Sequence, residues 1–119
     1  MPHLILSVNE PLVPHRLALL EAAHQAMLNH PVATNADIKS RLLVLADCIV
    51  GEHSSDGFVH AEVRLLRKPE RTLAVQKELS EQIVQALQAA LPSQTVAVQI
   101  SCDMVEMVAE TYGKVRTEP

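Results

Sequence analysis

Pro2 is the residue of this chain with the clearest chemical potential. The chain begins Met1-Pro2 and continues with the alternating run "HLILSV". We expect Met1 to be removed, because proline is small, and removal leaves Pro2 as a secondary amine at the start of a rigid element. An α-amino group has an ordinary pKa of about 8, and an apolar setting with nearby cations favours its neutral form, which acts as a general base. The alternative is a proline that only begins a strand, which is one of the few places where a sheet accepts it.

Arg71 is a second candidate because of its position relative to a predicted helix. It immediately precedes Thr72, a plausible N-cap. The free N–H groups at a helix N-terminus favour anions, and an arginine beside them can share in binding one. The alternative is a solvated surface arginine in the basic run "RLLRKPER". Spacing alone favours that alternative.

The six histidines and two cysteines do not form a metal-site pattern. No two of these residues have the short sequence spacing that is typical of a pair of metal ligands with a carboxylate or thiolate nearby. Cys48 and Cys102 lie in apolar runs and are expected to be reduced core residues. His24 is expected to be a hydrogen-bonded core residue, and Phe58 and His60 are expected to pack on one surface of a sheet. We therefore expect neither a metal nor another cofactor.

Composition restricts the class of protein. The 119 residues suffice for a single domain, 1–119, with one hydrophobic core. With 48% hydrophobic residues the chain is expected to fold, whereas 2% aromatic residues offer little stacking surface for bases. The net charge of −4 disfavours nucleic acid and anionic membranes as partners, and no apolar run approaches the length of about 20 residues that spans a bilayer. Without a signal-peptide pattern, we expect a cytoplasmic protein that binds a small molecule and copies of itself.

Two similar halves of the chain, about 2–50 and 57–108, must position the candidate residues. The first half predicts a strand over 3–8 and then a helix that ends before Pro31. The apolar stripe of that helix is expected to be Leu17, Leu20, His24, Met27 and Leu28. The run "RLLVLADCIV" at 41–50 is apolar on both faces, which predicts a strand buried in the centre of a sheet.

The second half repeats this order. The run "FVHAEVRLL" at 58–66 alternates as a half-buried strand, and a helix is expected between Thr72 and Pro92. Its apolar stripe is Leu79, Ile83, Leu87 and Leu91. The run "TVAVQISCDM" at 95–104 predicts the last strand.

Each half is therefore a β-α-β unit, which is right-handed with parallel strands. The predicted fold class is α+β: tandem β-α-β units forming a four-stranded mixed sheet with two helices on one face. The opposite face is expected to carry Ile5, Leu43, Leu45 and Ile49. Such an apolar face needs a cover, which self-assembly can supply.

This plan, with a strand-initial Pro2 and the segment "KPERTLAVQKELSEQIVQAL", resembles the tautomerase superfamily, whose members use an amino-terminal proline as catalytic base. Within it, "MPHLILSV", "IKSRLLVLAD", "GFVHAEVRLLRKPERT" and "TYGK" look most like the 5-carboxymethyl-2-hydroxymuconate isomerase family. The resemblance covers nearly the whole chain and implies a homotrimer. This chain differs from the family at Lys39, where the family's "I-R-S-R" segment has an arginine, and at Tyr112, where the family has a phenylalanine.

The resemblance implies Pro2 as the catalytic base, and Arg71, then Arg41, then Lys39 as the groups that bind substrate carboxylates. Tyr112 is expected at the substrate as well. The implied reaction moves a proton in an unsaturated 2-hydroxy di- or tricarboxylic acid, without a cofactor, in aromatic-compound degradation. Lysine keeps the charge at position 39 but loses the bidentate fork of arginine. The alternative function is a non-catalytic trimeric binding or scaffolding protein on the same fold.

Overall fold

The computed structural model describes residues 2–33 and 37–119. The strands are β1 (His3–Val8), β2 (Lys39–Val44), β3 (Gly57–Leu66) and β4 (Val98–Met107). The helices are α1 (Arg16–Leu28) and α2 (Leu73–Ala90), with 3₁₀ turns η1 (Glu10–His15), η2 (Pro31–Ala33) and η3 (Ala109–Thr111). The expected removal of Met1 concerns a residue outside the described ranges.

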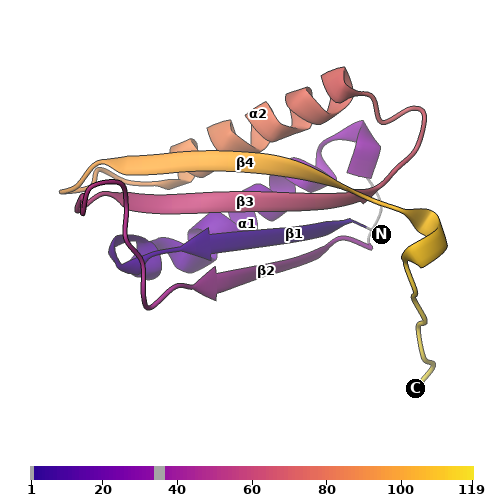
Figure 1. Ribbon diagram of the computed structural model, residues 1–119, viewed down its shortest axis with the longest axis horizontal. Coiled ribbons are helices and arrows are strands. Elements are labelled where there is room, and N and C mark those ends of the chain that lie inside the picture. The colour runs from indigo at the N-terminus through magenta and orange to yellow at the C-terminus, as the bar shows by residue number, and fades with distance from the viewer. Residues whose placement is uncertain (1, 34–36) are drawn as a thin grey trace.

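The four strands form one mixed sheet in the order β2-β1-β3-β4 (Figure 1). Within each half the two strands are parallel, as a crossover through a helix requires, and the two halves join through the antiparallel pair β1 and β3. The start of β1 therefore lies at the same end of the sheet as the ends of β3 and β4. The predicted fold class, two β-α-β units in a four-stranded sheet, is confirmed.

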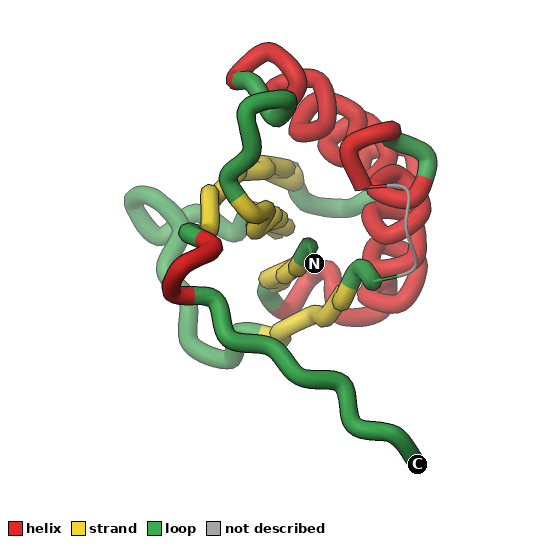
Figure 2. The backbone as a smooth tube through the Cα atoms, turned by 90° about the vertical axis from the view of Figure 1, so that its right-hand side faces the viewer, coloured by secondary structure: helices red, strands yellow, loops and turns green. Residues whose placement is uncertain are grey.

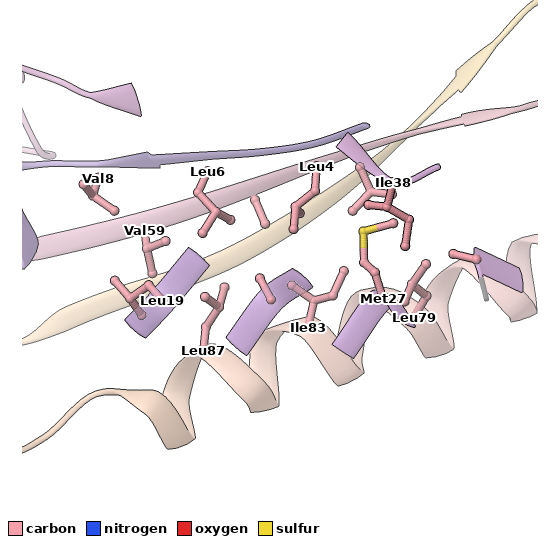
Figure 3. Close-up of a cluster of buried hydrophobic side chains, with 14 of the residues drawn as sticks. Leu4, Leu6, Val8, Leu19, Met27, Ile38, Val59, Leu79, Ile83 and Leu87 are labelled. Atoms are coloured by element: carbon pink, nitrogen blue, oxygen red, sulfur yellow. The ribbon is translucent and has the colours of Figure 1, made fainter. Parts of the chain in front are cut away.

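Both α-helices cover the same face of the sheet (Figure 2). Alternate side chains of the central strands point toward them and are fully buried, among them Leu4, Leu6 and Val8 of β1 (Figure 3). On β3 the buried set is Val59, Ala61, Val63 and Leu65, as its period of two predicts. The core thus lies between the sheet and one layer of helices.

Helix α2 follows its sequence pattern. The Thr72 side chain accepts a hydrogen bond from the backbone N–H of Val75, which is the predicted N-cap. Leu79, Ile83 and Leu87 are fully buried along one face. The cap and the stripe together fix where this helix begins and which side it turns to the sheet.

The face that helix α1 turns to the core differs in part from the predicted one. Leu19, Ala23 and Met27 are fully buried, whereas Leu17 is 66% exposed. The predicted stripe was therefore wrong at Leu17, whereas Leu20, Met27 and Leu28 do pack against the core. The reason is that α1 carries apolar residues on all sides, so the period of 3.6 residues does not select one face.

Strand β2 was expected in the centre of the sheet, and that prediction was wrong. It is an edge strand, and its apolar Leu43 and Val44 are each 50% exposed. The regular pairing of β2 ends at Val44, so residues 45–50 of the predicted run are not a strand. Ile49, which lies in this part, is 73% exposed. The apolar character of this run does not reflect burial inside a single chain.

The face of the sheet without helices is less apolar than expected. Strand register puts Ile5 and Leu43 on it, as predicted, but the same face carries His3, Arg41 and Glu62. Leu45 and Ile49 lie beyond the end of β2. Polar and charged residues therefore interrupt the apolar residues of this face, which include Val105 and Met107 on β4.

The cysteines are both free. Cys48 is exposed and so is not the core residue that we expected, because it lies after β2 has ended. Cys102 is partly buried on β4, and burial raises the pKa of its thiol to about 11. No helix in the described part of the chain is long and apolar enough to cross a membrane.

Candidate functional site

The candidate residues gather at the end of the sheet where β1 begins. Pro2 is fully buried there, and its carbonyl oxygen accepts a hydrogen bond from the backbone N–H of Lys39, 3.1 Å away. The next residue, His3, pairs with Lys39 on β2 and with Arg64 on β3. Pro2 therefore enters the sheet between two strands that each present a basic residue.

Lys39 and Arg41 stand two positions apart on β2 and so share the helix-free face. The Nζ of Lys39 donates to the backbone carbonyl of Asp37 at 2.8 Å. An Nη of Arg41 lies 3.1 Å from Nδ1 of His3. Both side chains are exposed, so each cation retains donors for an anion that approaches this face.

Tyr112 reaches the same place from the other end of the chain. It follows η3, which folds over the end of the sheet beside the N-terminus (Figure 1). Its hydroxyl lies 2.8 Å from Nε2 of His3. A hollow of about 440 Å³ opens here and is lined by His3, Arg41, Arg64, Val105, Glu106, Met107, Val108, Thr111 and Tyr112. The structure thus brings Arg41 and Tyr112 together through His3.

Arg71 lies at the same end of the sheet but lines a neighbouring hollow, and Glu106 borders both. Its guanidinium donates to the carbonyl of Leu66 at 2.8 Å and to that of Val32 at 3.3 Å. Two of its N–H groups therefore tie the end of β3 to η2. A guanidinium has five N–H donors, so the donors that remain on Arg71 are enough to bind both oxygens of one carboxylate.

The charge around His3 is predominantly positive. Partial burial, and then the charges of Arg41, Lys39 and Arg64, lower the pKa of His3 below its ordinary 6.5. The carboxylate of Glu62 lies 3.3 Å from Arg64 and so offsets part of this charge. The imidazole is consequently neutral near pH 7, and the surrounding cations favour a bound anion.

His3 was not among the residues that sequence reasoning selected. It follows Pro2 directly and occupies a position of β1 whose side chain points away from the core, which is a weak signal. Its partners, Arg41 and Tyr112, are 38 and 109 positions away in the chain. Such a contact follows only from the strand order and from the path of the C-terminal segment.

His15, His24, His30 and His60 have hydrogen-bond partners. His24 is partly buried and hydrogen-bonded to the hydroxyl of Ser40, as expected of a satisfied histidine. His30 is buried and lies 2.8 Å from a carboxylate oxygen of Glu78. Among residues 2–33 and 37–119, no group of three or more His, Cys, Asp or Glu residues is arranged to hold a metal ion.

This arrangement of strands and helices is similar to that of several solved structures. The chain is similar to the crystal structure of a 5-carboxymethyl-2-hydroxymuconate isomerase from Deinococcus radiodurans R1, with a TM-score of 0.83 and 22% identity over 98% of this chain and 90% of that one. A crystal structure of a 5-carboxymethyl-2-hydroxymuconate delta-isomerase matches with a TM-score of 0.80 and 20% identity, over 98% and 89% of the two chains. A fused 4-OT described as a symmetric trimer matches with a TM-score of 0.63 and 20% identity, over 87% and 85%.

Comparison of the sequence alone gives no such match. No family model matches the chain, and no curated protein does. The similarity to these solved structures therefore establishes the fold, and the reaction has to be argued from the site.

Proposed function

We propose that the protein is a cofactor-independent tautomerase that acts on an unsaturated 2-hydroxy di- or tricarboxylic acid. The observation that carries the proposal is the position of Pro2, which begins a central strand between Lys39 on β2 and the basic end of β3. Pro2 is fully buried at this position, and the strands on either side carry Lys39 and Arg64 opposite the next residue. With Met1 removed, we expect the secondary amine to lie in this buried setting near the two cations. Such surroundings favour the neutral amine that a general base requires.

The proposed reaction is a proton transfer in two steps. The neutral nitrogen of Pro2 takes the proton of the dienol hydroxyl, and the electron pair moves along the conjugated chain. Pro2 then returns the proton to a distant carbon, which yields the 2-oxo isomer. Arg41, Arg71 and Lys39 bind the carboxylates and stabilise the delocalised oxyanion between the two steps. Because the conjugated substrate itself carries the negative charge, this reaction needs no cofactor.

An absorbance assay tests this proposal. We expect turnover of 2-hydroxymuconate, which has two carboxylates, with a lower KM than for phenylenolpyruvate, which has one. A charge-assisted hydrogen bond to the second carboxylate is worth about 1.5–3 kcal/mol, so the expected difference is at least about tenfold. Equal KM values would contradict a site that binds two carboxylates.

The burial of Pro2 favours a second candidate, a non-catalytic protein that binds a small carboxylate on the same fold. Pro2 is fully buried within a single chain, where a base must still reach its substrate. Binding of 2-hydroxymuconate without any change in its absorbance spectrum, in protein that mass spectrometry shows to begin at Pro2, would support this candidate. Turnover would exclude it.

We also propose that the chain forms a homotrimer. The unpaired edge of β2 and its half-exposed Leu43 and Val44 offer a strand and an apolar strip to another subunit. The similarity to a structure described as a symmetric trimer supports a threefold arrangement.

Sedimentation equilibrium is expected to give three times the chain mass of 13.0 kDa at micromolar concentration. Leu43→Lys is expected to lower this mass, because it places a charge on the exposed strip. Leu17→Lys, at a 66% exposed position of α1, serves as the control and should leave the mass unchanged. A monomeric wild type would refute the trimer.

A further inference from the structure

His3 joins two residues that the proposed reaction uses. One nitrogen of its ring, Nδ1, lies 3.1 Å from the guanidinium of Arg41, and the other, Nε2, lies 2.8 Å from the hydroxyl of Tyr112. The rings of His3 and Tyr112 meet edge to face, with centroids 6.0 Å apart and an interplanar angle of 75°. Two hydrogen bonds and a ring contact thus fix the imidazole.

The chemistry of the partners sets the direction of both hydrogen bonds. A guanidinium only donates, so Nδ1 of His3 accepts from Arg41. A neutral imidazole then carries its proton on Nε2, which donates to the oxygen of Tyr112. The hydroxyl hydrogen of Tyr112 is left without an acceptor in residues 2–33 and 37–119. It is therefore available to a molecule in the hollow.

The charged groups on every side of His3 keep this arrangement in one protonation state. Arg41 and Lys39 approach from β2 and Arg64 from β3, and all three disfavour an imidazolium. Two carboxylates near this end of the sheet are paired with other side chains: that of Glu62 lies 3.3 Å from Arg64, and that of Glu106 on β4 lies 4.0 Å from Arg67.

We propose that His3 is a positioning residue that presents the hydroxyl of Tyr112 as a hydrogen-bond donor to a carboxylate or oxyanion of a small 2-oxo acid in this hollow. The volume of about 440 Å³ suits a small organic acid. Arg41 supplies the charge, and Tyr112 supplies a directed donor. This inference rests on the proposed function for the class of ligand, but its geometry does not depend on turnover.

The tautomer of His3 can be measured directly by ¹⁵N NMR of the histidine rings. We expect a neutral ring at pH 7 with its proton on Nε2, assigned through a His3→Gln variant that lacks the signal. In Arg41→Gln the pKa of His3 should rise toward 6.5, because one of the neighbouring cations is removed while an amide remains. A proton on Nδ1, or a charged ring at pH 7, would overturn the proposal.

Binding tests whether His3 acts through Tyr112. With 2-oxoadipate as an unreactive probe, Tyr112→Phe is expected to raise Kd about tenfold in the wild type but at most about twofold in a His3→Phe background. His3→Phe keeps an aromatic ring against Tyr112 and removes both nitrogens, so it separates hydrogen bonding from packing.

Equal effects of Tyr112→Phe in both backgrounds would refute the positioning role, and a wild type that does not bind 2-oxoadipate would refute the ligand class. Both results are independent of the absorbance assay. A protein with the expected tautomer and the expected coupling in binding, but with no turnover, would refute the tautomerase and leave the role of His3 intact.

Discussion

A chain that carries an extra residue ahead of Pro2 is expected to lose turnover of 2-hydroxymuconate by about 10²–10⁴-fold, the usual contribution of a general base. The extra residue converts the secondary amine of Pro2 into a tertiary amide, which has neither a basic lone pair nor a proton to exchange. The comparison is between protein released by a protease directly before Pro2 and the same protein with one residue retained. Mass spectrometry gives the processed fraction, and kcat/KM should scale with it.

Two controls keep this result specific to Pro2. The blocked protein should unfold at the same urea concentration as the processed one, and it should still bind 2-oxoadipate. Pro2→Ala in processed protein should lie between the two, because it keeps an amine but loses the ring that fixes it. Full turnover in a wholly blocked preparation would show that Pro2 is not the base and that it only begins a strand.

Leu19→Ala is expected to lower the free energy of unfolding by about 2–5 kcal/mol, whereas Leu17→Ala should change it by less than about 0.5 kcal/mol. Leu19 is fully buried between α1 and the sheet, and Leu17 is 66% exposed on the same helix. Because both changes replace leucine by alanine in one helix, the difference in helix propensity cancels. Urea unfolding followed by circular dichroism measures both.

The same pair of variants also distinguishes the observed face of α1 from the predicted one. The stripe through Leu17 predicts a large cost for Leu17→Ala and a small cost for Leu19→Ala. A large cost at both positions that depends on protein concentration would instead mean that a second subunit covers Leu17. Equal and small costs would contradict the packing of α1 on the sheet.

Sequence patterns predicted most of the fold because three of the four strands and α2 are half-buried elements with one apolar face. Their alternation or stripe then shows both the type of element and its inward side, as in β3 and at Leu79, Ile83 and Leu87 of α2. The pattern fails where apolar residues occupy both sides. That is the case in α1 and in the run after Arg41, where apolar residues are exposed in the single chain.

The candidate site was predictable only in part, for a different physical reason. Pro2, Lys39 and Arg41 lie within or beside predicted strands, so register alone brings them to one end of the sheet. Tyr112 joins them because η3 redirects the chain after β4, and no periodicity encodes that path. The contacts of His3 with Arg41 and Tyr112 could not be predicted, because both partners are distant from it in the sequence.

Because β1 is a central strand, we expect an aminopeptidase to have only a limited time in which to remove Met1 and free the amine of Pro2. β1 is made first, but its neighbours β2 and β3 follow it in the chain, and β3 ends only at Leu66. Until that residue has left the ribosome, the N-terminus has no sheet to enter and stays accessible to an aminopeptidase. At a synthesis rate of roughly 5–20 residues per second, this interval lasts seconds. Once β1 is inserted, Pro2 is fully buried. Rapid overproduction that outruns the peptidase would therefore trap blocked chains that fold normally and stay inactive.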